Sequence, residues 1–474
     1  MASVATAAIL CWSLITTCLS QHTSPGIHLP LFRRGGRFSR HEPANLTYLT
    51  QILNDVEAKY ARTYRAVEGN RLVRRWRQST EKDENDPEVI DVAGHENRWF
   101  TILEVANPKQ TLEVANPKQT LEVDIDMLSP DFYTVVTSSA MGMGYNASAS
   151  DSHGFSDDRV HAICKRSSEE FHFSGMFPVR LNMPICAPSK SSRQTLAMSG
   201  TLLGLGPHTE SLARLASTPF LTQLKERDLA ENRIWSATLL DSETGVLSLG
   251  GTIAKEFEEA KLRGEIELKH LGDPLATSHW VDEQVDAQLT FLIPPDASWD
   301  KHFKWTEVQG AAGWWTALMK GVWINGAKVL KNQPSIFDLN TPFILAPPIA
   351  AKRFYDSIGG TKRLPPPYDN FFAFPCLNRA NIALEIGGWN FPTMHGESTS
   401  ADALYGPAGG RFSLGKVADG TGYCVGSLVE TRMGLKKQWM ESGMKDMWVL
   451  GEPFFRGLGV VFDADEGRVG VRTY

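Results

Sequence analysis

The amino-acid sequence predicts an all-β protein in which two β-rich lobes follow one another along the chain. From about residue 97 onward, short apolar runs alternate with glycine-rich turns, a pattern typical of strands and hairpins. Long helical periods are few, and only residues 212–229 and 349–358 predict substantial helices. Strands spread over nearly 380 residues indicate two lobes. The clearest predicted strands are residues 99–105, 121–125, 234–240, 246–249, 382–386 and 459–462.

The composition is that of a globular protein. The 474 residues are 42% hydrophobic and 22% charged, with a net charge of −6, which excludes a disordered chain, a fibrous repeat and a polytopic membrane protein. The sequence has no Gly-x-Ser-x-Gly elbow, His-Glu-x-x-His zinc helix, Cys-x-x-Cys pair or Walker-type phosphate loop. We therefore expect no cofactor, no metal and no nucleic-acid partner, and carboxylates are the best candidates for chemistry.

The first 20 residues predict a secretory signal. The uncharged apolar stretch from Ala7 to Leu19 is shorter than the roughly 20 residues that a membrane span needs, and Cys18 and Ser20 are small residues that suit cleavage. The alternative is an uncleaved anchor. We expect a protein that is secreted or in an acidic lumen of the secretory pathway, without stable membrane insertion. Glycosylation sequons at Asn45 and Asn146 agree with secretion.

Charge is unevenly distributed along the chain. Residues 21–77 contain 11 Lys and Arg against four acids, a net charge of +7, so the remainder carries −13. An acidic body favours an intramolecular partner for this basic segment over a membrane or nucleic acid. The segment predicts an amphipathic helix that ends in the basic residues Lys59, Arg62 and Arg65, with its apolar face formed by Leu49, Ile52, Leu53, Val56 and Tyr60. The stretch from Arg74 to Arg77, followed by acidic residues 78–96, predicts an exposed linker with a processing site.

One tandem repeat is exact: the nine residues LEVANPKQT at 103–111 are copied at 112–120. A repeat this short and isolated does not predict a solenoid. Because nine is odd, absorbing the copy in register would reverse the faces of a strand, so we expect it to loop out as an extra hairpin or bulge.

Two acids stand out by their context. Asp126 and Asp338 each follow an apolar strand, and each has a hydroxyl residue three positions later, Ser129 and Thr341. The two acids are 212 residues apart, about half of the body. By itself such a pair could equally be two unrelated aspartates in turns.

The segments around these acids resemble the pepsin-like aspartic peptidase family, whose two lobes each contribute one catalytic Asp. Residues 99–102 resemble its opening strand, and residues 116–126 resemble its Gly-x-Pro-x-Gln turn and first catalytic strand. Residues 29–34 resemble the basic strand that begins the family's pro-segments. The likeness covers roughly residues 97–474, and its further motifs, in order, are 202–206, 313–315, 324–326, 338, 374–376, 386–388, 424–426, 450–455 and 460–463.

The resemblance implies a bilobal fold with a central cleft. With the signal at residues 1–20 and the acidic linker at 78–96, it divides the rest of the chain into a basic pro-segment at 21–77, an N-terminal lobe at 97–270, an inserted surface loop at 271–301 and a C-terminal lobe at 302–474. It also implies a monomeric zymogen that, in acid, hydrolyses peptide bonds of peptides or unfolded proteins.

The resemblance also assigns roles to single residues. Asp126 and Asp338 would be the catalytic pair sharing one proton, and Ser129 and Thr341 would hydrogen-bond and orient them. Four cysteines remain after removal of the signal, an even number that suggests two disulfides. The resemblance pairs Cys376 with Cys424, which leaves Cys164 and Cys186 as the second pair.

The catalytic loops depart from the family pattern, and this leaves the function open. Met127 and Leu339 stand where the family has a hydroxyl that ties the loops together, and Leu128 and Asn340 stand where it has glycine. Residues 170–178 lack the tyrosine of the family's flap, and Tyr145 lies too near Asp126 in the sequence to replace it. The sequence therefore allows an endopeptidase, weakened or not, a non-catalytic pseudopeptidase that binds a peptide or protein, or a duplicate with little function.

Overall fold

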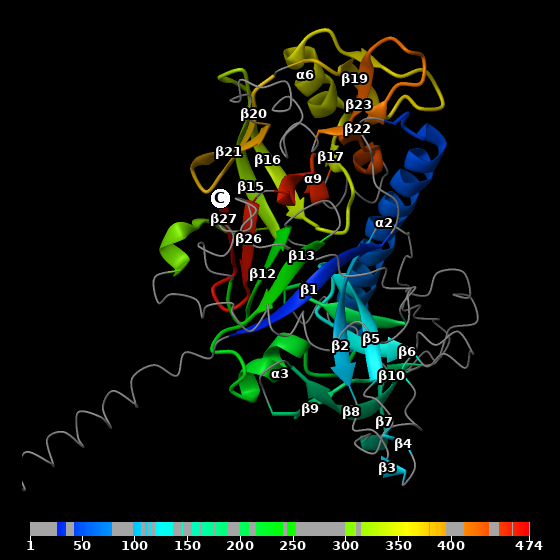
Figure 1. Ribbon diagram of the computed structural model, residues 1–474, viewed down its shortest axis with the longest axis vertical. Helices are drawn as coiled ribbons and strands as arrows, with labels where there is room; N and C mark the ends of the chain where they lie inside the picture. Colours follow the sequence, from blue (N-terminus) through cyan, green and yellow to red (C-terminus); the bar gives the residue numbers. More distant parts are fainter. Residues whose placement is uncertain are drawn as a thin grey trace, which may run out of the picture.

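The computed structural model describes most of the chain, and most of the described residues lie in strands (Figure 1). Strands of the N-terminal half gather at the bottom of the view and strands of the C-terminal half at the top. The predicted all-β class is confirmed. The predicted signal, the acidic linker 78–96, Asn146 and residues 271–298 lie outside the described residues. The described residues are 26–34, 42–77, 98–105, 110–111, 114–115, 119–135, 145, 154–161, 164–173, 177–186, 200–207, 215–239, 244–252, 299–309, 314–378, 380–394, 412–435, 445–456 and 458–473.

A sheet of 14 strands joins the N-terminal half of the body to the C-terminal strands. Its order in space is β14-β27-β26-β12-β13-β1-β2-β5-β11-β6-β10-β8-β7, with β9 paired to β8. The bounds are β1 (Ile27–Arg34), β2 (Arg98–Val105), β5 (Gln119–Asp126), β6 (Phe132–Val135), β7 (Gly154–His161), β8 (Cys164–His172), β9 (Val179–Asn182), β10 (Ile185–Cys186), β11 (Thr201–Gly204), β12 (Ile234–Leu239), β13 (Thr244–Leu249), β14 (Lys304–Glu307), β26 (Leu458–Asp463) and β27 (Arg468–Thr473).

Two smaller sheets build the C-terminal lobe. The seven-stranded sheet contains β15 (Thr316–Ile324), β16 (Ala327–Phe337), β17 (Ile344–Ala346), β20 (Ile382–Ile386), β21 (Trp389–Met394), β24 (Leu428–Glu430) and β25 (Trp448–Leu450). The four-stranded sheet contains β18 (Lys362–Arg363), β19 (Phe372–Pro375), β22 (Ser413–Lys416) and β23 (Tyr423–Gly426).

Four α-helices occur among the described residues: α2 (Leu46–Arg77), α3 (Phe220–Glu226), α6 (Pro348–Ile358) and α9 (Glu452–Phe455). The expected helix at 349–358 is confirmed as α6. The expected helix at 212–229 is wrong over residues 215–219 and 227–229, which are not helical. Pro219 precedes α3, and proline disfavours a helical conformation in the residue before it. Short 3₁₀ turns lie at Trp299–His302 and Met433–Leu435.

The basic N-terminal segment is part of the fold. Strand β1 lies inside the large sheet, antiparallel to β13 on one side and to β2 on the other. Its residues alternate between buried and half-buried positions, with Ile27, Leu29 and Leu31 on the buried face, as expected for a strand with one face in the core. The intramolecular partner expected for this segment is therefore the body of the same chain.

Helix α2 follows β1, begins beside β22 of the C-terminal half and runs from there toward the N-terminal strands (Figure 1). The predicted apolar face is buried in one cluster with Trp314, Phe343 and Phe371 of that half. The helix is longer than predicted, because it continues to Arg77 and takes in the stretch from Arg74 that we expected to be linker. Between Ala61 and Arg77 the sequence has no proline and one glycine, so nothing local ends the helix.

The nine-residue duplication does not disturb the register of its neighbours. Strands β2 and β5 pair as a hairpin, with Leu103 opposite Leu121 and Val105 opposite Gln119. Between them, β3 (Gln110–Thr111) and β4 (Val114–Ala115) pair with each other as a small separate hairpin. The copy therefore loops out as expected, and the core face of β5 that leads to Asp126 keeps its alternation.

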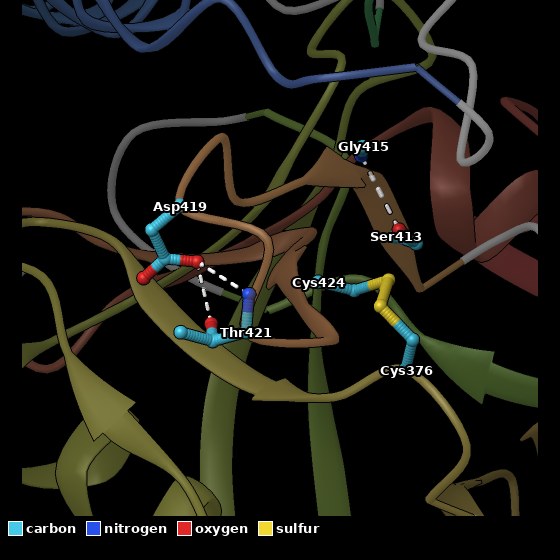
Figure 2. The surroundings of a disulfide bond; sticks show 6 residues. All are labelled: Cys376, Ser413, Gly415, Asp419, Thr421 and Cys424. Carbon is cyan, nitrogen blue, oxygen red and sulfur yellow. Dashed lines mark hydrogen bonds between the residues drawn. A yellow bond between two sulfur atoms is a disulfide. The ribbon is translucent and has the colours of Figure 1, made fainter.

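Two disulfides each join neighbouring strands. Cys164 of β8 is bonded to Cys186 of β10, directly opposite in the register. Cys376, just after β19, is bonded to Cys424 of β23, beside a turn in which the Asp419 carboxylate accepts hydrogen bonds from Thr421 (Figure 2). These are the pairs that the family resemblance implies.

Candidate active site

The two acid loops are built in the same way. Asp126 ends β5, which runs parallel to β11, and Asp338 follows β16, which runs parallel to β25. In each lobe the strand beside the acid is followed by a glycine that touches the residue three positions after the acid. A Cβ on Gly206 would lie 2.8 Å from the Ser129 backbone, and one on Gly451 would lie 2.0 Å from the carbonyl oxygen of Thr341. Both glycines are therefore required by close backbone approach.

The two loops meet between the lobes. The Leu339 backbone N–H donates to the Met127 sulfur at 3.0 Å, and the Asn340 side-chain amide donates to the Ile125 carbonyl oxygen at 2.5 Å. Because these four residues adjoin Asp126 or lie one and two positions after Asp338, the structure brings the two predicted acids together.

Asp338 is fully buried and is held by four hydrogen-bond donors. Its Oδ2 accepts from Lys59 Nζ at 2.8 Å, Tyr60 OH at 2.6 Å and Thr341 Oγ1 at 2.8 Å. Its Oδ1 accepts from the Asn340 backbone N–H at 3.2 Å. A carboxylate with this many donors, one of them a cation, is held in its charged form.

Burial and charge act in opposite directions on Asp338. Burial by itself raises the pKa of the carboxyl group, but the Lys59 ammonium and the hydrogen bonds from Lys59, Tyr60 and Thr341 outweigh it, so the pKa lies below 3.8. The pKa of Tyr60 is raised well above 10, first by burial and then by the charge of Asp338, with a smaller contribution from Asp126. Tyr60 is therefore a neutral phenol that donates a hydrogen bond to the Asp338 carboxylate.

Sequence reasoning missed the roles of Lys59 and Tyr60. Tyr60 was assigned only to the apolar face of the predicted helix, and Lys59 only to its basic end. The sequence did contain a signal. Tyr60 is a residue of the apolar face that carries a hydroxyl, it lies next to Lys59, and the segment has a net charge opposite to that of the body. Helix periodicity does not single out this pair, because adjacent residues on a helix point in different directions.

Asp126 has a more open environment. It is half-buried, and its Oδ1 accepts a hydrogen bond from the Leu128 backbone N–H at 2.9 Å. The role expected for Ser129 differs from the observed contacts, because the Ser129 hydroxyl donates to Asp131 Oδ2 at 3.0 Å and not to Asp126. Thr341, in contrast, does contact its aspartate. A serine hydroxyl can rotate, and the Asp131 carboxylate, two residues further along, lies within its reach.

The unusual loop residues are accommodated by specific contacts. Besides its bond to Ile125, the Asn340 side chain accepts from the Trp99 backbone N–H at 2.7 Å, so it links the second loop to two strands of the N-terminal half. Leu128 is buried in the same cluster as the apolar face of α2. The bulk at these two positions is thus packed or hydrogen-bonded, and it does not separate the loops.

The hairpin β8–β9 occupies the place in the chain where the family has its flap. Phe171 lies opposite Val179, and Phe171 and Phe173 are buried in the core, whereas Phe177 is 93% exposed. Tyr145 is buried, and its hydroxyl donates to Glu169 of β8. Tyr145 therefore supports this hairpin.

Neither a metal centre nor a membrane helix is evident in the described part of the chain. Within it, no cluster of three or more His, Cys, Asp or Glu side chains is placed to bind a metal ion. No helix there combines the length and apolar character needed to cross a membrane.

This architecture, with two β-rich lobes that each supply one aspartate loop, is the bilobal all-β fold of pepsin-like aspartic peptidases. Comparison with known proteins agrees, although no family model matches the chain. Over 162 residues it is 28% identical to an aspartic protease of Phaffia rhodozyma, covering 33% of this chain and 34% of that protein. Over 187 residues it is 22% identical to probable aspartic-type endopeptidases CTSD of Trichophyton verrucosum and Arthroderma benhamiae, covering 39% of this chain and 31% of each relative.

The similarity is distant and partial. The matches span about a third of the length of these curated relatives. They support a relationship to aspartic peptidases at low identity.

Proposed function

We propose that the chain is the precursor of an acid-acting aspartic endopeptidase, and that the segment containing β1 and α2 is its pro-segment. The observation that carries this proposal is the contact of Lys59 Nζ with Asp338 Oδ2 at 2.8 Å. A lysine from the N-terminal segment forms an ion pair with the carboxylate that the reaction needs, and Tyr60 donates a hydrogen bond to the same carboxylate. In this state Asp338 is ionised by its neighbours and cannot share a proton with Asp126.

Release of the segment would restore the chemistry of a carboxyl pair. Two carboxyl groups that lie close together share one proton, because both cannot be ionised at once. The ionised member takes a proton from a water molecule, whose oxygen attacks the peptide carbonyl, while the protonated member donates to the carbonyl oxygen. The resulting tetrahedral intermediate breaks at the C–N bond as the nitrogen receives the proton that was taken from water, and the other carboxyl group recovers the proton that it gave to the carbonyl oxygen. By position, Asp126 and Asp338 would be this pair, and Thr341 would orient Asp338.

Acid would favour release of the segment. Its cations pair with carboxylates of the body: Arg33 with Glu452 at 3.3 Å, Arg34 with Glu122 at 2.6 Å and with Asp124 at 2.7 Å, and Lys59 with Asp338. Because the pKa of Asp338 is depressed in this state, its contact stabilises the closed form above the ordinary carboxyl range. That stabilisation is lost as the pH falls through the depressed pKa, below 3.8.

The test is acidification of the purified full-length chain. We expect loss of the N-terminal segment, seen by mass spectrometry, and digestion of an unfolded protein substrate that begins only in acid. Asp126→Asn and Asp338→Asn are the matched controls, since each keeps the volume and removes the acid. We expect digestion to fall about a thousandfold or more in both. An absence of digestion across the acid range would overturn the proposal and leave the binding-only pseudopeptidase.

We also propose that the protein is made with a cleaved signal, is glycosylated and is released as a monomer from the cell or into an acidic lumen. Two disulfides support an oxidising compartment. Asn45 is exposed at the start of α2, where its side-chain oxygen accepts from the Tyr48 backbone N–H at 3.1 Å. N-terminal sequencing of the expressed protein, enzymatic deglycosylation and light scattering test these three points.

A further inference from the structure

The contact between the two acid loops rests on two side chains that the resembled family does not have. Met127 follows Asp126, and its sulfur accepts the Leu339 backbone N–H at 3.0 Å. Asn340 lies two positions after Asp338, and its amide donates to the Ile125 carbonyl oxygen at 2.5 Å. Both side chains are almost fully buried. Both hydrogen bonds cross between the lobes, and both are donated by the loop after Asp338 and accepted by the loop around Asp126.

These two bonds divide the work of a pair of hydroxyl groups. A hydroxyl can both donate and accept, whereas a thioether only accepts and weakly, and Leu339 can do neither with its side chain. Met127 supplies the acceptor for the backbone of the second loop. The Leu339 side chain has no hydroxyl to donate to the first loop, and the Asn340 amide, one residue further along, supplies that donor. The two substitutions are therefore complementary.

Asn340 is also anchored at both ends. Its side-chain oxygen accepts from the Trp99 backbone N–H at 2.7 Å, at the beginning of β2, which pairs with β5. Its own backbone N–H donates to Asp338 Oδ1 at 3.2 Å. A shift of Asn340 relative to the N-terminal half would therefore move the Asp338 carboxylate relative to Asp126.

We infer that Met127 and Asn340 are positioning residues that hold the Asp126 and Asp338 carboxyl groups at their working separation. This inference rests on the proposed peptidase function, because positioning matters only if the pair reacts. A displacement of about 1 Å at a reacting group can cost on the order of a hundredfold in rate. Loss of these two hydrogen bonds between the loops should affect the rate of the chemical step more than the binding of substrate.

The first experiment changes Met127 in the acid-activated protein. Met127→Leu keeps the volume and removes the acceptor, and we expect kcat to fall about tenfold with KM nearly unchanged. The acid limb of the pH profile of kcat should shift as well, because the two carboxyl groups would titrate more independently. Met127→Thr supplies a hydroxyl acceptor and should recover most of the loss. Met183→Leu is the matched control, since Met183 is equally buried in the same core cluster, and its kcat should equal that of wild type.

The second experiment changes Asn340. Asn340→Leu keeps much of the volume but removes both the donor to the Ile125 carbonyl and the acceptor for Trp99, so we expect a larger loss in kcat, about thirtyfold. Asn340→Gly, which restores the family's residue, removes both bonds. Its kcat should also fall. If Asn340 were only a bulky residue that the loop tolerates, replacing it with glycine would instead raise kcat.

The outcomes separate this inference from the proposed function. If wild type digests substrate and Met127→Leu and Asn340→Leu match it in kcat and pH profile, the inference is overturned and the proposed function stands. If wild type does not digest substrate at all, the proposed function fails first. Amide hydrogen exchange at Leu339 then tests the hydrogen bond from the Leu339 N–H to the Met127 sulfur. Exchange about tenfold faster in Met127→Leu than in Met183→Leu supports this hydrogen bond, and equal exchange overturns it.

Discussion

Asp126 and Asp338 end equivalent strands in the two halves of the molecule, yet their surroundings differ. Among the described residues, Asp126 is half-buried and receives one backbone donor, whereas Asp338 is fully buried and receives four donors, including a lysine. Thr341 contacts its aspartate, whereas Ser129 contacts Asp131 instead. The comparison teaches that the backbone repeats between the lobes while the N-terminal segment acts on the second acid.

The largest expected effect comes from Lys59→Met, which leaves the buried Asp338 without its cation. We expect the segment-bound form to lose about 3 to 5 kcal/mol of unfolding free energy at neutral pH. In the variant, burial is no longer opposed by Lys59, so the pKa of Asp338 is higher than in wild type and the loss of stability on acidification is smaller than in wild type. Thermal unfolding across pH measures this.

Lys225→Met is the control for that comparison. It removes a lysine that contacts Asp465 at 3.0 Å but is 42% exposed, and it should cost less than about 1 kcal/mol. Equal losses in the two variants would contradict the special role of the second acid.

A smaller effect is expected for Tyr60→Phe. The phenol donates to an ionised carboxylate, so its removal should cost about 2 to 3 kcal/mol above the pKa of Asp338, and less below it once Asp338 is protonated. Tyr355→Phe removes another buried phenol, which donates to the Leu428 carbonyl oxygen at 2.7 Å. Its cost should not change with pH. A Tyr60→Phe cost that is flat with pH would show that Asp338 is not the acceptor in solution.

The two hydroxyl residues sharpen the comparison between the loops. Thr341→Val should cost about 1 to 2 kcal/mol and lower the rate of digestion about tenfold, because it removes a bond to Asp338. Ser129→Ala should lower the rate much less, since its partner is Asp131. Thr341→Ser should restore the rate. If the two losses in rate are equal, the loops behave symmetrically once the segment has left, and the asymmetry belongs to the closed form.

The smallest effect is expected from deletion of residues 106–114, the extra sequence that precedes only the first loop. The deletion joins Val105 to Ala115 and leaves four residues to close the β2–β5 hairpin, so the pairing of Val105 with Gln119 is kept. Because the insert loops out, stability should change by no more than about 0.5 kcal/mol. Thermal unfolding and digestion rates both check this. A large loss would mean that the copied hairpin packs on the first loop.

Sequence reasoning located the acids and most of the strands for physical reasons that are local. Burial sets the alternation before Asp126, the apolar run before Asp338 and the helical spacing from Leu49 to Tyr60. The order of apolar residues in the sequence reveals this burial directly. The partners of these residues are set by tertiary contact. The rotation of the Ser129 hydroxyl, the use of the Met127 sulfur as an acceptor and the placement of Lys59 on Asp338 all depend on groups from distant segments.

The position of β1 has a consequence for the protein after the segment leaves. Six of its residues face β13 and four face β2, so its departure would expose two backbone edges that point toward each other. Neighbouring strands lie about 4.8 Å apart, so the opening would be about 9 to 10 Å wide, which admits a single extended chain and no thicker element. Open edges of this kind attract other strands. The released protein would thus need one extended segment to pair with both open edges and close its sheet. Whether such a segment is present would control the solubility of the protein.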